Sequence, residues 1–125
     1  MSTLKTVLFS NNQYIVIALR NQLKAQGINL EYLDQKHLDS ADLILITKGH
    51  VAVCELRRQL IPLYRPKSIV LVRTSKLFRL GEKSGFEASI VKLGYPHVYV
   101  AQKDETNDVL AAYALRVILE SFNIA

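Results

Sequence analysis

The sequence lacks the long apolar runs on which membrane proteins depend. Its longest apolar stretches, near residues 41–47 and 68–72, fall far short of the ~20 residues of a membrane-spanning helix. The first ten residues also lack the basic start and the extended apolar run of a secretory signal. We therefore expect a soluble, cytoplasmic chain with no membrane span.

Cysteine is almost absent, and the spacings typical of metal sites are missing. The single cysteine, Cys54, cannot form an internal disulfide. The three histidines, His37, His50 and His97, show no metal-ligand spacing. Thr47 lies near His50, but a hydroxyl and an imidazole without a third orienting group do not predict a hydrolase. We therefore expect no metal, no cofactor and no catalytic residue.

The chain does contain enough apolar residues for one compact core. It has 125 residues, 50% of them hydrophobic, which suffices to bury roughly two-thirds of the unfolded surface. No linker, internal repeat or low-complexity tract divides it. We therefore expect residues 1–125 to form a single domain.

The positive charge is concentrated in the middle of the chain. The formal net charge is +5, and residues 48–92 contain ten Lys or Arg against three Glu. A localised excess of this kind favours an acidic protein surface, nucleic acid or an anionic membrane as a partner. An equally weighted alternative is a solvated surface that only maintains solubility.

Apolar β-rich runs alternate with helical patterns along the whole chain. This alternation predicts an α/β fold with a parallel sheet and helices on both faces. The segment at residues 34–40 leaves room for a turn or two of helix at most, so the second helix is shortened or missing. Strands are expected at residues 6–9, 28–33, 41–46, 68–72 and 97–101, and the longer helices at residues 11–26, 51–60 and 86–93 and after residue 104.

Capping patterns set the ends of these helices. Ser10 with Gln13, and Ser84 with Glu87, have the spacing of capping boxes. Asp104 or Thr106 is expected to cap the last helix. The first helix should end at Gly27 and the third at Gly94, because glycine adopts the left-handed conformation that closes a helix.

The order of these elements resembles the receiver domain of bacterial response regulators over nearly the whole chain. The segment TVLFSNNQYIVIALRNQLKAQG, residues 6–27, carries the first strand and a helix closed by glycine, as in that family. The resemblance implies a flavodoxin-like, three-layer sandwich with a five-stranded parallel sheet. In the family, carboxylates at the strand ends hold Mg²⁺ and accept a phosphoryl group.

The residues that fall on the family's acidic pocket are not acidic. The Mg²⁺-binding pair falls on Ser10 and Asn11, and the phosphoacceptor falls on Thr47. Arg73, or Thr74 with a shift of one residue, takes the hydroxyl position of the fourth strand. The lysine position of the fifth strand falls on Ala101, two residues before Lys103. The resemblance thus implies a degenerate receiver pocket made of Ser10, Asn11, Thr47, Arg73, Thr74 and Lys103.

These replacements change what the pocket can do. Mg²⁺ prefers carboxylate oxygens, whereas Ser10 and Asn11 offer only neutral ones. Thr47 cannot form an acyl phosphate, and Arg73 would supply the positive charge that a metal normally brings. The resemblance therefore implies a pseudo-receiver: a non-enzymatic module for signal transduction or transcriptional control that acts through protein contact or self-association, independently of phosphorylation.

Two surfaces are candidates for such contacts. The segment RTSKLFRLGEK, residues 73–83, is a candidate docking loop through Lys76, Phe78, Arg79 and Lys83, with Phe78 as an apolar anchor. Alternatively, its apolar residues plug the edge of the core while its cations stay in water. The face that often mediates dimers in receivers would include Tyr95, Val98, Tyr99, Tyr113 and Arg116, which makes a homodimer an expectation of the resemblance.

Two other functions stay open. A nucleic-acid-binding or anionic-surface module would use Arg57, Arg58, Lys76 and Arg79, although no helix-turn-helix or RNA-binding signature is present. A divergent flavodoxin-like or phosphocarrier component would bind or transfer phosphate just after the first strand. That site usually needs glycines and several hydroxyls, or a nucleophilic Cys or His, and residues 10–14, SNNQY, provide neither set.

Overall fold

A five-stranded parallel sheet with helices on both faces forms the described part of the molecule. The computed structural model describes residues 2–10, 13–48, 68–74 and 77–121. Its elements, in order, are β1 (Ser2–Ser10), α1 (Gln13–Ala25), β2 (Ile28–Leu33), the 3₁₀ helix η1 (Gln35–Ser40), β3 (Leu43–Lys48), β4 (Ile69–Thr74), α3 (Glu82–Val91), β5 (His97–Ala101) and α4 (Asp108–Ser121). The strand order is β2-β1-β3-β4-β5, and every neighbouring pair is parallel. The predicted fold class is therefore confirmed.

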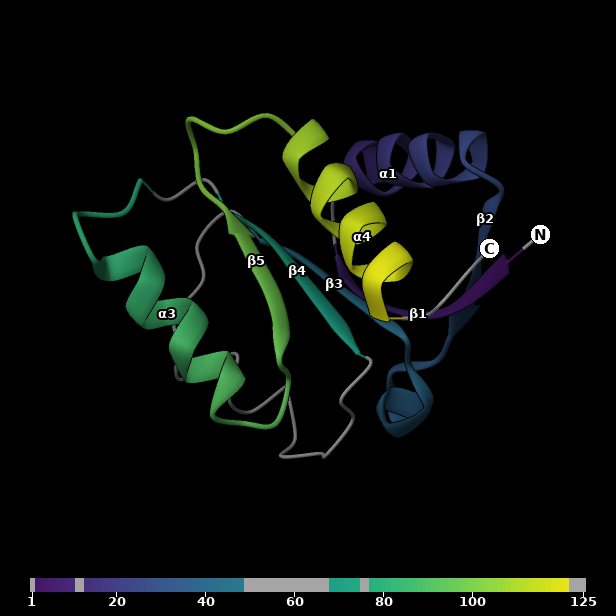
Figure 1. Ribbon diagram of the computed structural model, residues 1–125, viewed down its shortest axis with the longest axis horizontal. Helices are drawn as coiled ribbons and strands as arrows, with labels where there is room; N and C mark the ends of the chain where they lie inside the picture. Colours follow the sequence, from purple (N-terminus) through teal and green to yellow (C-terminus); the bar gives the residue numbers. More distant parts are fainter. Residues whose placement is uncertain (1, 11–12, 49–67, 75–76, 122–125) are drawn as a thin grey trace.

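The central strands are apolar on both sides because helices cover both faces of the sheet. Helix α3 lies on one face, and α1 and α4 lie side by side on the other (Figure 1). Along β3, Ile44 and Ile46 pack toward Phe86 and Ile90 of α3. Leu43 and Leu45 alternate to the opposite face, where they join α1 and α4. This alternation produces two hydrophobic cores, one on each side of the sheet.

The connection from β2 to β3 is short, as predicted. It contains only the six-residue 3₁₀ helix η1. Asp34 starts the turn, because its side chain accepts a hydrogen bond from the Lys36 N–H at 3.2 Å and its carbonyl accepts one from the His37 N–H at 2.9 Å. The prediction of a shortened or missing second helix is confirmed.

The helix ends agree with the sequence at the glycines but not at every cap. Gly27 closes α1 with a φ of 78°, and Gly94 follows α3 with a φ of 103°. The capping box predicted at Ser84 is wrong. Gly81, with a φ of 81°, lets α3 begin at Glu82, and the Glu82 carboxylate accepts a hydrogen bond from the Arg79 N–H at 3.4 Å.

Other boundaries shift by a few residues. Strands β2 and β5 have the predicted bounds. Strand β1 begins four residues before its predicted start, β3 begins and ends two residues later than predicted, and β4 begins one residue and ends two residues later. Helix α4 begins at Asp108, later than the caps predicted at Asp104 or Thr106. The predicted helix at residues 51–60 and the side chains of the Ser10–Gln13 box lie outside what the structure describes. Within the described part of the chain, no helix is both long and apolar enough to cross a membrane.

Candidate functional site

Four strand ends form one row at the carboxyl edge of the sheet. Ser10 of β1 pairs with Thr47 of β3, Thr47 pairs with Arg73 of β4, and Arg73 pairs with Ala101 of β5. The sheet thus brings together residues that are up to 91 positions apart, at the edge where open α/β sheets place their sites. Neutral or basic residues occupy the whole row. Asn11, the other residue of the predicted pair, is not among the described residues.

Arg73 places a cation within the row of strand ends. Its half-buried guanidinium donates from Nη1 to the carbonyl oxygen of Gln102 at 3.2 Å. Thr74, at the alternative hydroxyl position, is 2% exposed. Lys103 is exposed on the turn after β5. Among residues 2–10, 13–48, 68–74 and 77–121, no group of three or more His, Cys, Asp or Glu is placed to hold a metal ion.

The loop before α3 places its apolar residues differently from the predicted docking loop. Phe78 is half-buried, its ring centroid lies 5.7 Å from that of Phe86, and its N–H donates to Oε1 of Gln102 at 3.0 Å. Phe78 therefore closes the core and is not the apolar anchor of a docking loop that the sequence suggested. Leu77 and Leu80 are instead exposed, at 59% and 106%, so the alternative that all three apolar residues plug the core is also wrong in part. Arg79 is exposed, and Lys76 lies outside the described residues.

Lys83 is committed to a contact within the molecule. Its Nζ lies 2.8 Å from Oε1 of Glu105, and the two side chains are 24% and 19% exposed. The same Nζ lies 4.4 Å from the centroid of the Tyr99 ring. Glu105 also accepts hydrogen bonds from the Tyr99 hydroxyl and, at 3.2 Å, from the Gln102 N–H. A cation predicted for partner binding is thus already paired.

The pKa shifts in this cluster keep Glu105 and Lys83 charged and Tyr99 neutral. Burial alone would raise the pKa of Glu105, but hydrogen bonds from Lys83, Tyr99 and the Gln102 N–H outweigh it and lower that pKa. For Lys83, burial alone would lower the pKa, but the hydrogen bond and the charge of Glu105 outweigh it and raise that pKa. Burial and the Glu105 carboxylate raise the pKa of the Tyr99 hydroxyl, which stays protonated and donates.

Side chains cap alternate N–H groups along the open edge of β5. The Val98 N–H binds the Tyr113 hydroxyl, and the Val100 N–H donates to Oε2 of Glu87 at 3.3 Å. The Gln102 N–H, next in the alternation, reaches the Glu105 carboxylate already described. Burial raises the pKa of Glu87. Because these donors are occupied, the edge is protected against the addition of another strand.

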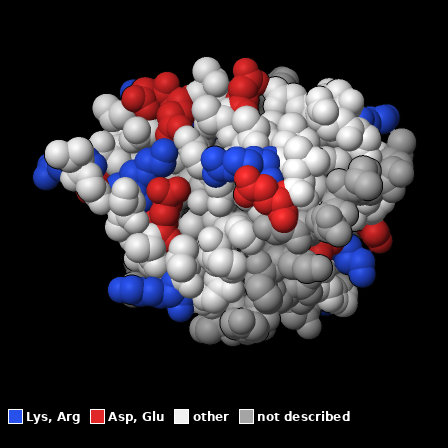
Figure 2. All heavy atoms as spheres, viewed as in Figure 1, with Lys and Arg blue, Asp and Glu red and all other residues white. Residues whose placement is uncertain are grey.

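The predicted dimer face divides into a buried and an exposed part. Tyr95 is 0% exposed and Val98 is 8% exposed, so both belong to the core under α3 and the prediction that they lie on the face is wrong. Tyr99 and Tyr113 are half-buried with ring centroids 5.3 Å apart, and the guanidinium carbon of Arg116 lies 5.2 Å from the Tyr113 ring centroid. On this side of the molecule, basic and acidic side chains lie next to one another (Figure 2).

Sequence reasoning did not identify the residues that hold these parts together. Gln102 binds Arg73 through its carbonyl, Phe78 through its side chain and Glu105 through its N–H. Glu105 is the acceptor for Lys83, 22 positions earlier. No local pattern signals a glutamine or a glutamate with this role, because their partners meet only when β4, α3 and β5 are assembled.

The fold is similar to those of several solved structures. A response regulator from Thermotoga maritima superposes with a TM-score of 0.61 at 18% identity, over 95% of this chain and 99% of that chain. A segment of a lysine decarboxylase from Francisella novicida gives a TM-score of 0.60 at 12% identity, over 98% of this chain and 18% of that chain. An atypical orphan response regulator, described as having a phosphorylation-independent regulatory mechanism, gives 0.53 at 13% identity, over 92% and 95%.

Neither a protein-family model nor a curated protein matches the chain. At the identities of the structural neighbours, likeness establishes fold and not activity, and the neighbours themselves include both regulators and a segment of an enzyme. The chain therefore has the receiver-like flavodoxin fold.

Proposed function

We propose that this chain is a receiver-like regulatory module that acts through protein contact or self-association, without phosphoryl transfer. The observation that carries the proposal is the row of Ser10, Thr47, Arg73 and Ala101, in register at the carboxyl ends of four adjacent strands. A row of this composition suits a signalling scaffold better than a phosphoacceptor site. The response regulators among the structural neighbours support the proposed role in signal transduction, and transcriptional control is part of the same proposal.

The chemistry of the row argues against aspartyl phosphorylation. Mg²⁺ binds poorly where carboxylate oxygens are missing, and a threonine hydroxyl at position 47 cannot give the acyl phosphate that a carboxylate gives. The Arg73 guanidinium adds a fixed positive charge, which opposes the entry of a divalent cation by like-charge repulsion. The conformation of the module would therefore not depend on phosphorylation of the strand-end pocket.

The surface formed by Tyr99, Tyr113 and Arg116 is the proposed contact face. Tyrosine and arginine are the residue types that most often carry the binding energy of protein interfaces. The two rings already contact each other at a 43° tilt and the Arg116 guanidinium carbon lies 5.2 Å from the Tyr113 ring centroid, so these side chains need little rearrangement to bind a partner. Because the β5 edge is capped, contact would occur through these side chains and not through strand pairing.

An NMR titration with Mg²⁺ and beryllofluoride, a phosphate mimic, tests the absence of phosphoryl chemistry. We expect no saturable shift of the Ser10, Thr47 and Arg73 amide signals. The triple variant Ser10→Asp, Asn11→Asp, Thr47→Asp restores the carboxylates and serves as the positive control, because it should gain Mg²⁺-dependent shifts. Saturable shifts in the unmodified chain at submillimolar Mg²⁺ would contradict the proposal.

Light scattering over a concentration series tests self-association. The unmodified chain should approach twice its monomer mass, and Arg116→Glu should move the transition to higher concentration because it reverses a charge within the contact face. Lys92→Glu makes the same charge change at an exposed residue near the end of α3 and should leave the transition in place. A strict monomer at high concentration would eliminate self-association and leave only contact with a different protein.

A further inference from the structure

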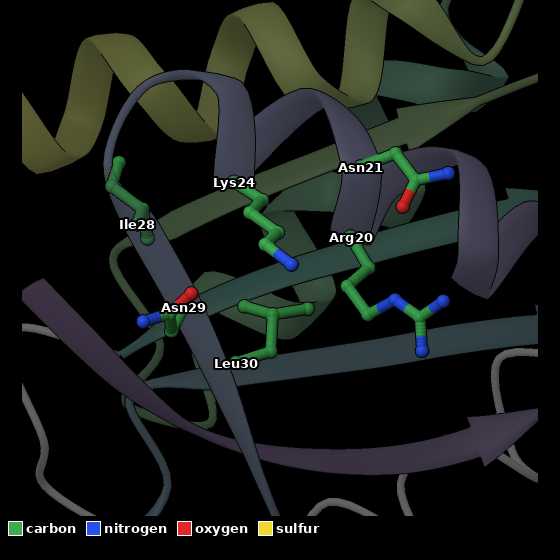
Figure 3. A pocket seen from close by; sticks show the side chains of 6 residues that line it. All are labelled: Arg20, Asn21, Lys24, Ile28, Asn29 and Leu30. Carbon is green, nitrogen blue, oxygen red and sulfur yellow. The ribbon is translucent and has the colours of Figure 1, made fainter.

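A polar pocket lies between the last turns of α1 and the start of β2, far along the sheet from the row of strand ends. Its volume is about 440 Å³, and its lining residues are Arg20, Asn21, Lys24, Ile28, Asn29 and Leu30 (Figure 3). We propose that this pocket binds a small anionic ligand that carries phosphate or carboxylate groups. The site does not use the degenerate receiver pocket, so it goes beyond the function proposed above.

Helix and strand periodicity explain why these side chains converge. Arg20 and Lys24 are four residues apart in α1, which puts them on the same side of the helix. Both side chains extend from the same side of α1 (Figure 3). On the strand, Ile28 and Leu30 are two residues apart and face α1 together. The cations therefore overhang an apolar floor, of which Ile28 is 4% exposed.

Among the described residues, the lining of the pocket contains no Asp or Glu beside the two cations. Arg20 and Lys24 are exposed, and neither forms an ion pair with another described residue. Glu31, the nearest acidic residue along β2, alternates to the opposite face of the sheet from Leu30. Two like charges on adjacent turns destabilise a helix, and Lys24 alone is compensated by its position in the last turn. An anion between them would remove the repulsion.

The lining suits a compact anion better than an apolar ligand. A guanidinium binds phosphate or carboxylate through two parallel N–H donors, and an ammonium adds a second charge. The amide of Asn21 offers further donors from the same helix. The volume is within the range of small-molecule sites, roughly 300–1,000 Å³. The floor at Ile28 and Leu30 can accept a short apolar portion of the same ligand.

The test is an NMR titration of the full chain with pyrophosphate and, separately, with citrate, at constant ionic strength. We expect saturable shifts at Arg20, Asn21 and Asn29. The double variant Arg20→Gln, Lys24→Gln should weaken binding by about tenfold or more, because it removes two charge-assisted contacts. The control Lys5→Gln, Lys92→Gln removes the same charge at exposed residues outside the pocket and should change affinity less than about twofold.

The outcomes separate the ligand classes. Preference for pyrophosphate identifies a phosphoryl ligand, and equal binding of citrate identifies a general oxyanion site; both support the proposal. Asn21→Asp, which adds a carboxylate to the pocket without removing a cation, should also weaken binding. Shifts that never saturate, an equal loss in the control variant, or binding of only an oligoglutamate peptide or single-stranded oligonucleotide would overturn the proposal.

Discussion

Replacing Glu105 by glutamine tests whether the cluster of Lys83, Tyr99 and Glu105 stabilises the fold. The carboxylate accepts from three donors: the Lys83 ammonium, the Tyr99 hydroxyl and the Gln102 N–H. Glutamine keeps one acceptor oxygen, but its NH₂ group must face one of these donors. With its amide oxygen in the Oε1 position, glutamine still accepts from Lys83 and the Gln102 N–H, and its NH₂ group faces the Tyr99 hydroxyl. Glu105→Gln therefore removes the ion pair and weakens two hydrogen bonds: the one from Lys83, which loses its charged acceptor, and the one from Tyr99, which loses its acceptor oxygen.

The expected loss is about 2 kcal/mol in the free energy of unfolding. A hydrogen bond to a charged group contributes about 1.5–3 kcal/mol when buried, and an exposed ion pair contributes less than about 1 kcal/mol. The Lys83 and Glu105 side chains are 24% and 19% exposed, so about 1 kcal/mol for each of the two weakened bonds is an intermediate value. For a domain of 125 residues, the melting temperature should fall by about 8 °C.

Urea unfolding followed by circular dichroism measures this loss. A double-mutant cycle with Lys83→Met should give a coupling energy of about 1 kcal/mol between the two side chains. Lys92→Met removes an exposed lysine near the end of α3 and should change stability by less than about 0.5 kcal/mol. A loss below about 0.5 kcal/mol for Glu105→Gln, or no coupling with Lys83, would refute the reasoning.

Further predictions concern pH, backbone conformation and packing. The lowered pKa of Glu105 means that its stabilisation is present above its ordinary pKa of 4.5 and is lost as pH falls through the lower folded-state value, so Glu105→Gln should flatten acid unfolding in that range. The raised pKa of Glu87 has the opposite sign, because stability then falls as pH rises through the folded-state value; Glu87→Gln should remove this loss, and an unchanged pH profile would contradict the assignment. Gly81→Ala should cost about 1 kcal/mol at a φ of 81°, whereas Gly85→Ala, inside α3 with open space at its Cβ, should stabilise by about 0.5–1 kcal/mol; equal effects in thermal melts would show that backbone strain does not decide them. Leu71→Ala, at a fully buried position of β4, should cost about 3 kcal/mol, and a loss under about 1 kcal/mol would mean that the core readily collapses around the gap.

The sheet was predictable because its evidence is local. Strand β2 is an alternating run just after Gly27, and β5 is a short apolar run after Gly94, so both bounds agree with the sequence. The parallel arrangement follows from alternation of strands and helices. The short 3₁₀ helix between β2 and β3 was predictable because only seven residues, 34–40, were available there. The helix starts were harder to predict than the strands, because α3 begins after Gly81 and not after the capping pattern at Ser84.

The candidate surfaces depend on tertiary contacts that no local pattern encodes. The sequence around Phe78 and Tyr95 is compatible with either burial or exposure of these side chains. Tyr95 is buried and Phe78 is half-buried because α3 packs over this part of the sheet. The reverse holds for Leu77, which is exposed although its neighbour is packed. The pairing of Lys83 with Glu105 joins a helix to a loop beyond the next strand, so its charges cannot be assigned to solvent or partner from the sequence.

Gln102 links the two regions on which the proposed regulation depends. It contacts Arg73 in the row of strand ends and Glu105 in the cluster beside the contact face. A movement of the guanidinium would therefore disturb the hydrogen bonds that position Glu105 and Tyr99. By thermodynamic reciprocity, if a change at the strand-end row altered the affinity of the tyrosine face for a protein, binding of that protein would favour the same change at the row by the same free energy.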